Sequence, residues 1–269
     1  DFIAGGTGSG NVNRAYTVSL LDGLKNVGYS IDAKVQEKYE AYKKQVAEER
    51  AAEAEKNKGN HLYSFLPQPL PKEIVPTGAD LKDAVAANDA AIITLGRISG
   101  EFLDRPTDNF NLSAEELNLI KSVCGAFHAA GKKVIVVLNI GGVIESSSWK
   151  NMPDAVLLAW QAGQEGGNSV ADVLSGKVSP SGKLPMTWPV KLEDHASTKN
   201  FPRAENFDLN INVFMGKEDE KAEPREFWDY TNYSEGIFVG YRWFDKQNLE
   251  VSYPFGYGLS YTPFAYRNA

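Results

Sequence analysis

The sequence predicts an α/β fold in which a mostly parallel sheet carries helices on both faces, an α/β sandwich, followed by an irregular or β-rich tail. Three apolar runs of strand length show no alternation with polar residues, which is typical of strands buried on both faces. They are residues 90–95, 134–138 and 155–160. Helical patterns separate these runs, and this alternation indicates a parallel sheet with right-handed crossovers.

Two helices are predicted before the first of these strands. The first spans residues 14–27 and is ended by Gly28. Its apolar face consists of residues that recur at helical spacing, namely Val18, Leu21, Leu24 and Val27. The second, residues 32–57, is heavily charged with one narrow apolar stripe, so we expect a solvated helix packed by one edge. Residues 60–78 contain four prolines and predict an extended connection.

The later helices lie between the strands. A short helix over residues 81–87 precedes the first strand. Ser113 and Glu116 have the spacing of a capping box, and the helix that they begin ends at Gly131. A further helix includes residues 170–174. These elements complete the strand–helix alternation.

The pattern changes after about residue 190. Residues 236–244 predict a strand, and residues 253–264 predict an aromatic, glycine-rich extended tail. We therefore divide the chain into a sandwich domain, residues 1–190, and a connecting segment with the tail, residues 191–269. Glycine-rich turns usually follow a β-strand, and none precedes Gly5, so we expect a fragment of a longer polypeptide that lacks the first strand.

Composition excludes several classes of function. The formal charge is −7, with 28 Lys and Arg against 35 Asp and Glu, and such a surface disfavours nucleic-acid binding. There is no run of roughly 18 apolar residues, so we expect no membrane span. Cys124 is the single cysteine, which excludes an internal disulfide and a multi-cysteine zinc site.

Ligands of parallel sheets bind at the carboxyl ends of the strands, and this rule selects residues 5–11, 96–109, 139–149 and 161–167. The first loop is not a phosphate loop, because no Lys follows Gly10 and Asn11 replaces the third glycine of the dinucleotide fingerprint. Its backbone N–H groups and the hydroxyls of Thr7 and Ser9 can face a polar ligand. Taken alone, a tight turn that requires positive φ is the simpler interpretation.

The second loop contains a candidate general acid. Glu101 follows a buried strand and a flexible glycine, and partial shielding by Phe102 and Leu103 would raise its pKa. A structural ion pair with Arg97 or Arg105 explains the same spacing equally well. The spacing leaves both interpretations open.

Other reactive residues are weaker candidates. His61, His128 and His195 show neither the order of a Ser/His/Asp site nor metal-ligand spacing. Cys124 lies on a helical face and is predicted to be a small buried hydrophobe. Glu165 can touch a ligand or, more simply, hold the start of the next helix.

Six segments together resemble glycoside hydrolase family 3, the β-glucosidase group. They occur in family order: Gly5–Gly10, Arg97–Arg105, Trp160–Glu165, Pro180–Pro185, Tyr233–Tyr241 and Pro254–Tyr261. One such motif is weak, whereas six in order are specific. From the resemblance we expect the fibronectin-like domain that often follows the aromatic tail in this family to be absent or only begun here. The helix at 32–57 is interpreted as an elaboration without a catalytic role.

The resemblance implies a retaining, exo-acting hydrolase with two catalytic carboxylates, acting on a β-linked glucoside or oligosaccharide. It assigns the acid/base to Glu101 and a sugar-hydroxyl contact to Ser9, with Thr7 and Phe102 also expected at the substrate. Phe102 stands where many members have Gly. The nucleophilic Asp would lie on a (β/α)₈ barrel outside this chain, attached covalently or present as a second chain, so we expect this chain alone to be inactive. No metal or cofactor is implied.

Two rivals come from other classes of function. A non-catalytic sugar-binding module of the same fold would keep the loops without using Glu101 as an acid. A nucleotide-dependent α/β enzyme is disfavoured, because the phosphate-binding patterns fail at Gly10 and Asn11.

Overall fold

A computed structural model describes most of the chain: residues 2–59, 69–99, 101, 105–199, 234–265 and 267. The fold has two compact units. One comprises Asp1–Gly182 with Gly258–Ala269, and the other comprises Lys183–Tyr257. The division of the chain into a sandwich domain, residues 1–190, and a connecting segment with a tail, residues 191–269, stays a prediction.

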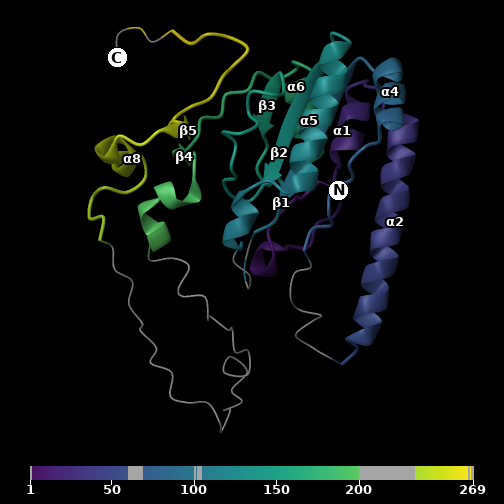
Figure 1. The fold of residues 1–269 in the computed structure, drawn as a ribbon, viewed down its shortest axis with the longest axis horizontal. Coiled ribbons are helices and arrows are strands. Elements are labelled where there is room, and N and C mark those ends of the chain that lie inside the picture. Colours follow the sequence, from purple (N-terminus) through teal and green to yellow (C-terminus); the bar gives the residue numbers. More distant parts are fainter. Residues whose placement is uncertain are drawn as a thin grey trace. The chain divides into compact units, whose positions relative to one another are not determined.

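A three-stranded parallel sheet forms the centre of the first unit (Figure 1). Its strands are β1 (Ala90–Arg97), β2 (Lys133–Ile140) and β3 (Ala155–Leu158), with β2 in the middle. Register places Arg97 beside Ile140 and Leu138 beside Leu158. The three carboxyl ends therefore meet at one edge, and the predicted parallel sheet is confirmed.

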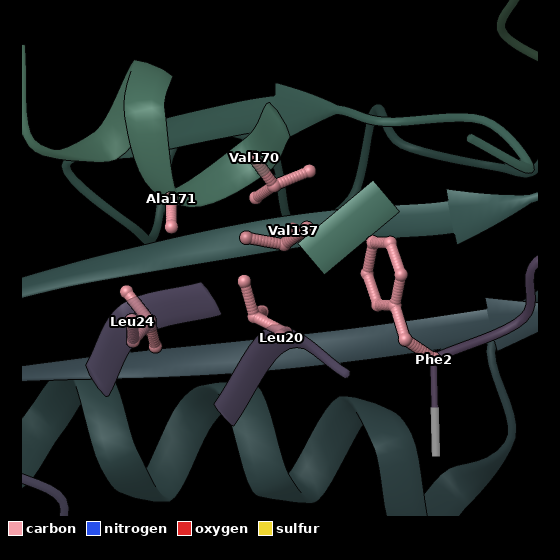
Figure 2. Close-up of a cluster of buried hydrophobic side chains, with 6 residues drawn as sticks. All are labelled: Phe2, Leu20, Leu24, Val137, Val170 and Ala171. Carbon is pink, nitrogen blue, oxygen red and sulfur yellow. The ribbon is translucent and has the colours of Figure 1, made fainter. Parts of the chain in front are cut away.

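Helices α1 (Leu20–Asn26) and α6 (Gly166–Leu174) pack together over one face of this sheet. Figure 2 shows the buried cluster that joins them to β2. Its members are Phe2, Leu20, Leu24, Val137, Val170 and Ala171. Helix α5 (Ala114–Ala129) contacts β1 and β2. Because side chains alternate along a strand, the buried Val136 and Leu138 of β2 point away from Val137, which indicates that α5 covers the other face.

The capping box of α5 is confirmed, since Ser113 Oγ accepts from Glu116 N at 3.1 Å and the Glu116 carboxylate accepts from Ser113 N at 2.8 Å. Two further helices lie at the edge of this unit, α2 (Ala33–Lys56) and α4 (Gly78–Ala87). Helix α2 has no buried residue, as expected for a solvated helix. Lys34 of α2 pairs with Asp83 of α4 at 2.9 Å. None of the helices within the described ranges has the length and apolar character needed to cross a membrane.

The first helix is shorter than predicted. It begins at Leu20, because the Ser19 hydroxyl caps it by accepting from Asp22 N, and Val18 N donates to Gln164 O at 2.8 Å instead of joining a helix. Two residues of the predicted apolar face are confirmed, since Leu24 is buried and Val27 packs against the core. Leu21 was wrong, because it is exposed and Leu20 is buried instead.

The predicted strand at residues 236–244 was wrong. The second unit contains helix α8 (Tyr241–Gln247), besides the antiparallel strands β4 (Trp188–Pro189) and β5 (Val251–Tyr253). Gly240 immediately before α8 has φ of +60°, which interrupts the extended backbone that a continuous strand would need. Of the apolar residues in the predicted strand, Phe244 is the one that α8 buries.

The contact of α1 with α6 depends on glycine. A Cβ at Gly23 would lie 2.1 Å from the main-chain oxygen of Gly167. Gly23→Ala is therefore expected to lower the free energy of unfolding by about 2 kcal/mol or more, through overpacking between two backbones. Urea unfolding measures the change.

Gly125→Ala is the matched control, since it changes a helical glycine in α5 whose added Cβ meets nothing within 4 Å. It is expected to raise the free energy of unfolding by about 0.5–1 kcal/mol through helix propensity. Equal effects of the two substitutions would contradict the close helix contact.

Candidate active site

The N-terminal segment is fixed at the carboxyl edge of the sheet by Asn139, which lies near the end of β2 and is buried. Its Oδ1 accepts from Ile3 N, and its Nδ2 donates to Ile3 O at 2.9 Å and to Trp160 O at 2.7 Å. Gly163 N also donates to Ala4 O at 2.9 Å. One amide side chain thus joins the end of β2, the first residues and the segment after β3.

The residues Gly5–Gly10, here called the glycine loop, continue from this anchor. The loop turns at Gly8, whose φ is +59°, and Gly10 N donates to Thr7 O at 3.1 Å. The positive φ favours glycine, and the hydrogen bond closes a tight turn, as predicted. The turn also leaves the Ser9 N–H outside its own hydrogen bonds, so this group can serve another acceptor.

That acceptor is Glu101, after the end of β1. Ser9 N donates to the Glu101 carboxylate at 2.7 Å, and Thr7 Oγ1 donates to the main-chain oxygen of Glu101 at 2.9 Å. Glu101 is exposed. The structure therefore brings together three of the four predicted site residues, Glu101, Ser9 and Thr7. Phe102 lies outside the described residues.

The alternative of an ion pair with Arg97 or Arg105 was wrong within the described part of the chain. Arg97 is buried and forms a bidentate pair with Glu116, at 2.5 and 2.7 Å. Arg105 donates to Val143 O at 3.0 Å and to Asn109 O and Oδ1 at 2.9 and 2.7 Å. Both guanidinium groups hold the loop after β1, and the Glu101 carboxylate is left to the glycine loop.

The expected rise in the pKa of Glu101 was also wrong for this chain. Its pKa is lowered, first by the hydrogen bond from the Ser9 hydroxyl and then by the bond from Ser9 N–H. Donors stabilise the ionised carboxylate. Desolvation acts in the opposite direction but is the smaller influence, because Glu101 lies at the surface.

The loops after β1 and β2 are in close contact at Gly141. Its N–H donates to Arg97 O at 2.9 Å, and a Cβ there would lie 2.0 Å from Ser99 Oγ. A Cβ at the next glycine, Gly142, would lie 3.0 Å from the Arg105 guanidinium. These two glycines let the loop after β2 support the loop that carries Glu101.

Glu165 has a structural environment. Its carboxylate accepts from the hydroxyl of Tyr16 and, at 2.7 Å, from Asn168 Nδ2 in the first turn of α6. Both hydrogen bonds lower the pKa of Glu165. These contacts match the simpler of its two predicted roles, holding the start of the next helix.

The remaining candidates lie in other environments. His128 is 2.9 Å from Asp154, which precedes β3 at the amino edge of the sheet, and His195 packs against Phe244 in the second unit. Burial raises the pKa of the buried Cys124 thiol, as expected for an inert hydrophobe. His61 lies outside the described residues. Where the structure is described, no three His, Cys, Asp or Glu residues form a metal-binding group.

Comparison with known proteins gives a consistent result. A family model described as the glycosyl hydrolase family 3 C-terminal domain matches residues 2–241. The chain is 33% identical to beta-glucosidase A of Butyrivibrio fibrisolvens, over 98% of this chain and 30% of that protein. It is 35% identical to a beta-glucosidase of Ruminococcus albus, over 98% of this chain and 24% of that protein.

A solved structure shows the same fold. The chain resembles beta-glucosidase 3B from Thermotoga neapolitana in complex with glucose, with 40% identity and a TM-score of 0.78 over 97% of this chain and 33% of that one. The chain thus spans about a quarter to a third of the length of these relatives.

The contact with Ser9 predicts the titration of Glu101 in this chain. Its pKa is expected below the ordinary value of 4.5, and Ser9→Ala should move the pKa upward because the hydroxyl is the largest cause of the shift. A carbon-13 NMR titration, with the signal assigned through Glu101→Gln, measures both values.

The lowered pKa of Glu101 determines how this contact changes the stability of the protein with pH. Any stability from this contact is present above the unfolded-state pKa and is lost as the pH falls through the lower folded-state pKa. A Glu101 pKa at or above its ordinary value, with no response to Ser9→Ala, would show that the contact is not formed in solution.

Proposed function

The chain belongs to glycoside hydrolase family 3, and from this membership we propose that it is the acid/base-bearing part of a retaining, exo-acting β-glucosidase. The reaction is hydrolysis of terminal, non-reducing β-D-glucosyl residues. The observation that carries the proposal is the Glu101 carboxylate, exposed at the carboxyl edge of a parallel sheet and held by the glycine loop rather than by an arginine.

The proposed mechanism divides the chemistry between two carboxylates. Retaining glycosidases place them about 5–5.5 Å apart, one as nucleophile and the other as acid and then base. Glu101 protonates the departing glycosidic oxygen and later removes a proton from water. The nucleophilic Asp belongs to a (β/α)₈ barrel outside this chain, covalently attached or a separate chain. Support comes from the greater length of the relatives, of which this chain covers a third or less.

The lowered pKa of Glu101 fits the second of these steps. A carboxylate that Ser9 keeps ionised is ready to accept a proton from water. For the first step it must be protonated, and a second carboxylate close by favours this because like charges raise a pKa. The partner domain thus supplies both the nucleophile and the electrostatic condition for the acid. This chain alone is therefore inactive.

Ser9 is proposed to contact a sugar hydroxyl. Its N–H bonds the Glu101 carboxylate, which places the Ser9 side chain beside the proposed acid/base. Phe102 is proposed as a further residue on the substrate side, from the family resemblance alone. A non-catalytic sugar-binding module remains the alternative, with the same loops but no proton transfer.

Glu101→Gln in the complete protein tests the proposal. We expect a loss of about 10²–10⁴-fold in kcat/KM on cellobiose, the contribution of a general acid. 2,4-Dinitrophenyl β-D-glucoside, whose leaving group needs no protonation, should form the glycosyl-enzyme normally, and azide should restore turnover. Residues 1–269 assayed alone should show no hydrolysis.

Glu53→Gln is the control, because Glu53 is an exposed glutamate on α2. It should leave turnover of both substrates unchanged. Unchanged cellobiose hydrolysis by Glu101→Gln would overturn the acid/base assignment and favour the binding module.

A further inference from the structure

We propose that Thr7 is a positioning residue that sets the main-chain location of Glu101, rather than a substrate contact. The inference rests on the proposed function, because the position of Glu101 matters to catalysis only if Glu101 transfers the proton. The carrying contact is the 2.9 Å hydrogen bond from Thr7 Oγ1 to the main-chain oxygen of Glu101. This bond uses the one proton of the Thr7 hydroxyl on the protein itself.

Glu101 needs such a hold because of where it lies in its loop. Before it, the loop is fixed at Arg97, whose carbonyl accepts from Gly141 N at 2.9 Å. After it, the loop is fixed at Arg105, which donates to Val143 O at 3.0 Å. At Glu101 itself, the hydrogen bonds to other described residues all come from the glycine loop.

Thr7 and Ser9 act on different parts of Glu101. Ser9 bonds the carboxylate and so influences its charge, whereas Thr7 bonds the carbonyl and so fixes the backbone from which the side chain extends. Such a division is useful in an acid/base, since the carboxylate must change partners during the reaction while its backbone stays in place. Misplacement by about 1 Å can cost on the order of 10²-fold in rate.

The backbone at Thr7 suits this role. Its φ of −102° and ψ of 173° are extended values that β-branched residues adopt readily. A β-branched side chain has few χ1 rotamers, so the hydroxyl is directed at little entropic cost. Thr7 also lies only four residues after Ile3, which Asn139 anchors from the buried end of β2. The hydrogen bond therefore connects Glu101 to the core rather than to a free segment.

The test uses the complete protein and two substrates that differ in their need for an acid. Thr7→Val keeps the shape of the side chain and removes the hydroxyl. We expect kcat/KM on cellobiose to fall about 10–100-fold and that on 2,4-dinitrophenyl β-D-glucoside to fall less than about 3-fold. Thr7→Ser restores the hydroxyl and should recover cellobiose hydrolysis to within about 3-fold.

Thr17→Val is the matched control, because it makes the same change at an exposed threonine of the same N-terminal segment. It should leave both substrates unaffected. Melting temperatures of all variants show whether each is folded. If Thr7→Val does not fold, Thr7→Ala is assayed in its place.

The outcomes are distinguishable. Equal losses of Thr7→Val on both substrates would overturn the inference in favour of a sugar contact or a purely structural role, and wild-type activity would overturn it as well. Either result leaves the proposed function standing if Glu101→Gln still loses only acid-dependent turnover. Wild-type cellobiose hydrolysis by Glu101→Gln would instead overturn the proposed function, and the positioning role with it.

Discussion

The arrangement of the candidate site depends on the hydrogen bonds of the Asn139 side chain. The buried amide bonds both main-chain groups of Ile3 and the carbonyl of Trp160, so three segments distant in sequence share one side chain. Buried polar groups without partners cost about 1–3 kcal/mol each, so these backbone groups are strongly held to Asn139. The glycine loop extends from this anchor and reaches Glu101.

A second fixed point lies on the other side of Glu101. Arg97 bonds the carbonyls of Asn109 and Asn111 as well as the Glu116 carboxylate, so it closes the loop that begins at its own position. Glu116 also accepts from Ser113 N in the capping box of α5. The start of a helix and both ends of a loop are thereby linked through one ion pair, between the buried Arg97 and the largely buried Glu116. Removing either partner would leave an uncompensated buried charge, which is strongly destabilising.

Local patterns made much of this fold predictable. The capping box of Ser113 and Glu116, the apolar runs of the strands and the charged helix α2 all depend on residues close in sequence. The role of Asn139 could not be predicted, because its partner Ile3 is 136 positions away. The partner of Arg97 was missed for a different reason, since two glutamates, Glu101 and Glu116, are both near it in sequence and spacing does not choose between them. Helix α8 was not predicted because its apolar residues resemble a strand, and the positive φ of Gly240 is a conformation that glycine permits but its sequence position does not reveal.

We propose that this edge of the sheet presents Glu101 to a glycosidic oxygen, with the attack coming from another domain. A crystal structure of the complete protein with a non-hydrolysable thio-linked cellobioside tests this most directly. We expect a Glu101 carboxylate oxygen within about 2.6–3.2 Å of the bridging atom, and about 5–5.5 Å from the nucleophilic carboxylate. A Glu101 carboxylate turned away from the bound sugar, with another acid at the bridging atom, would contradict it.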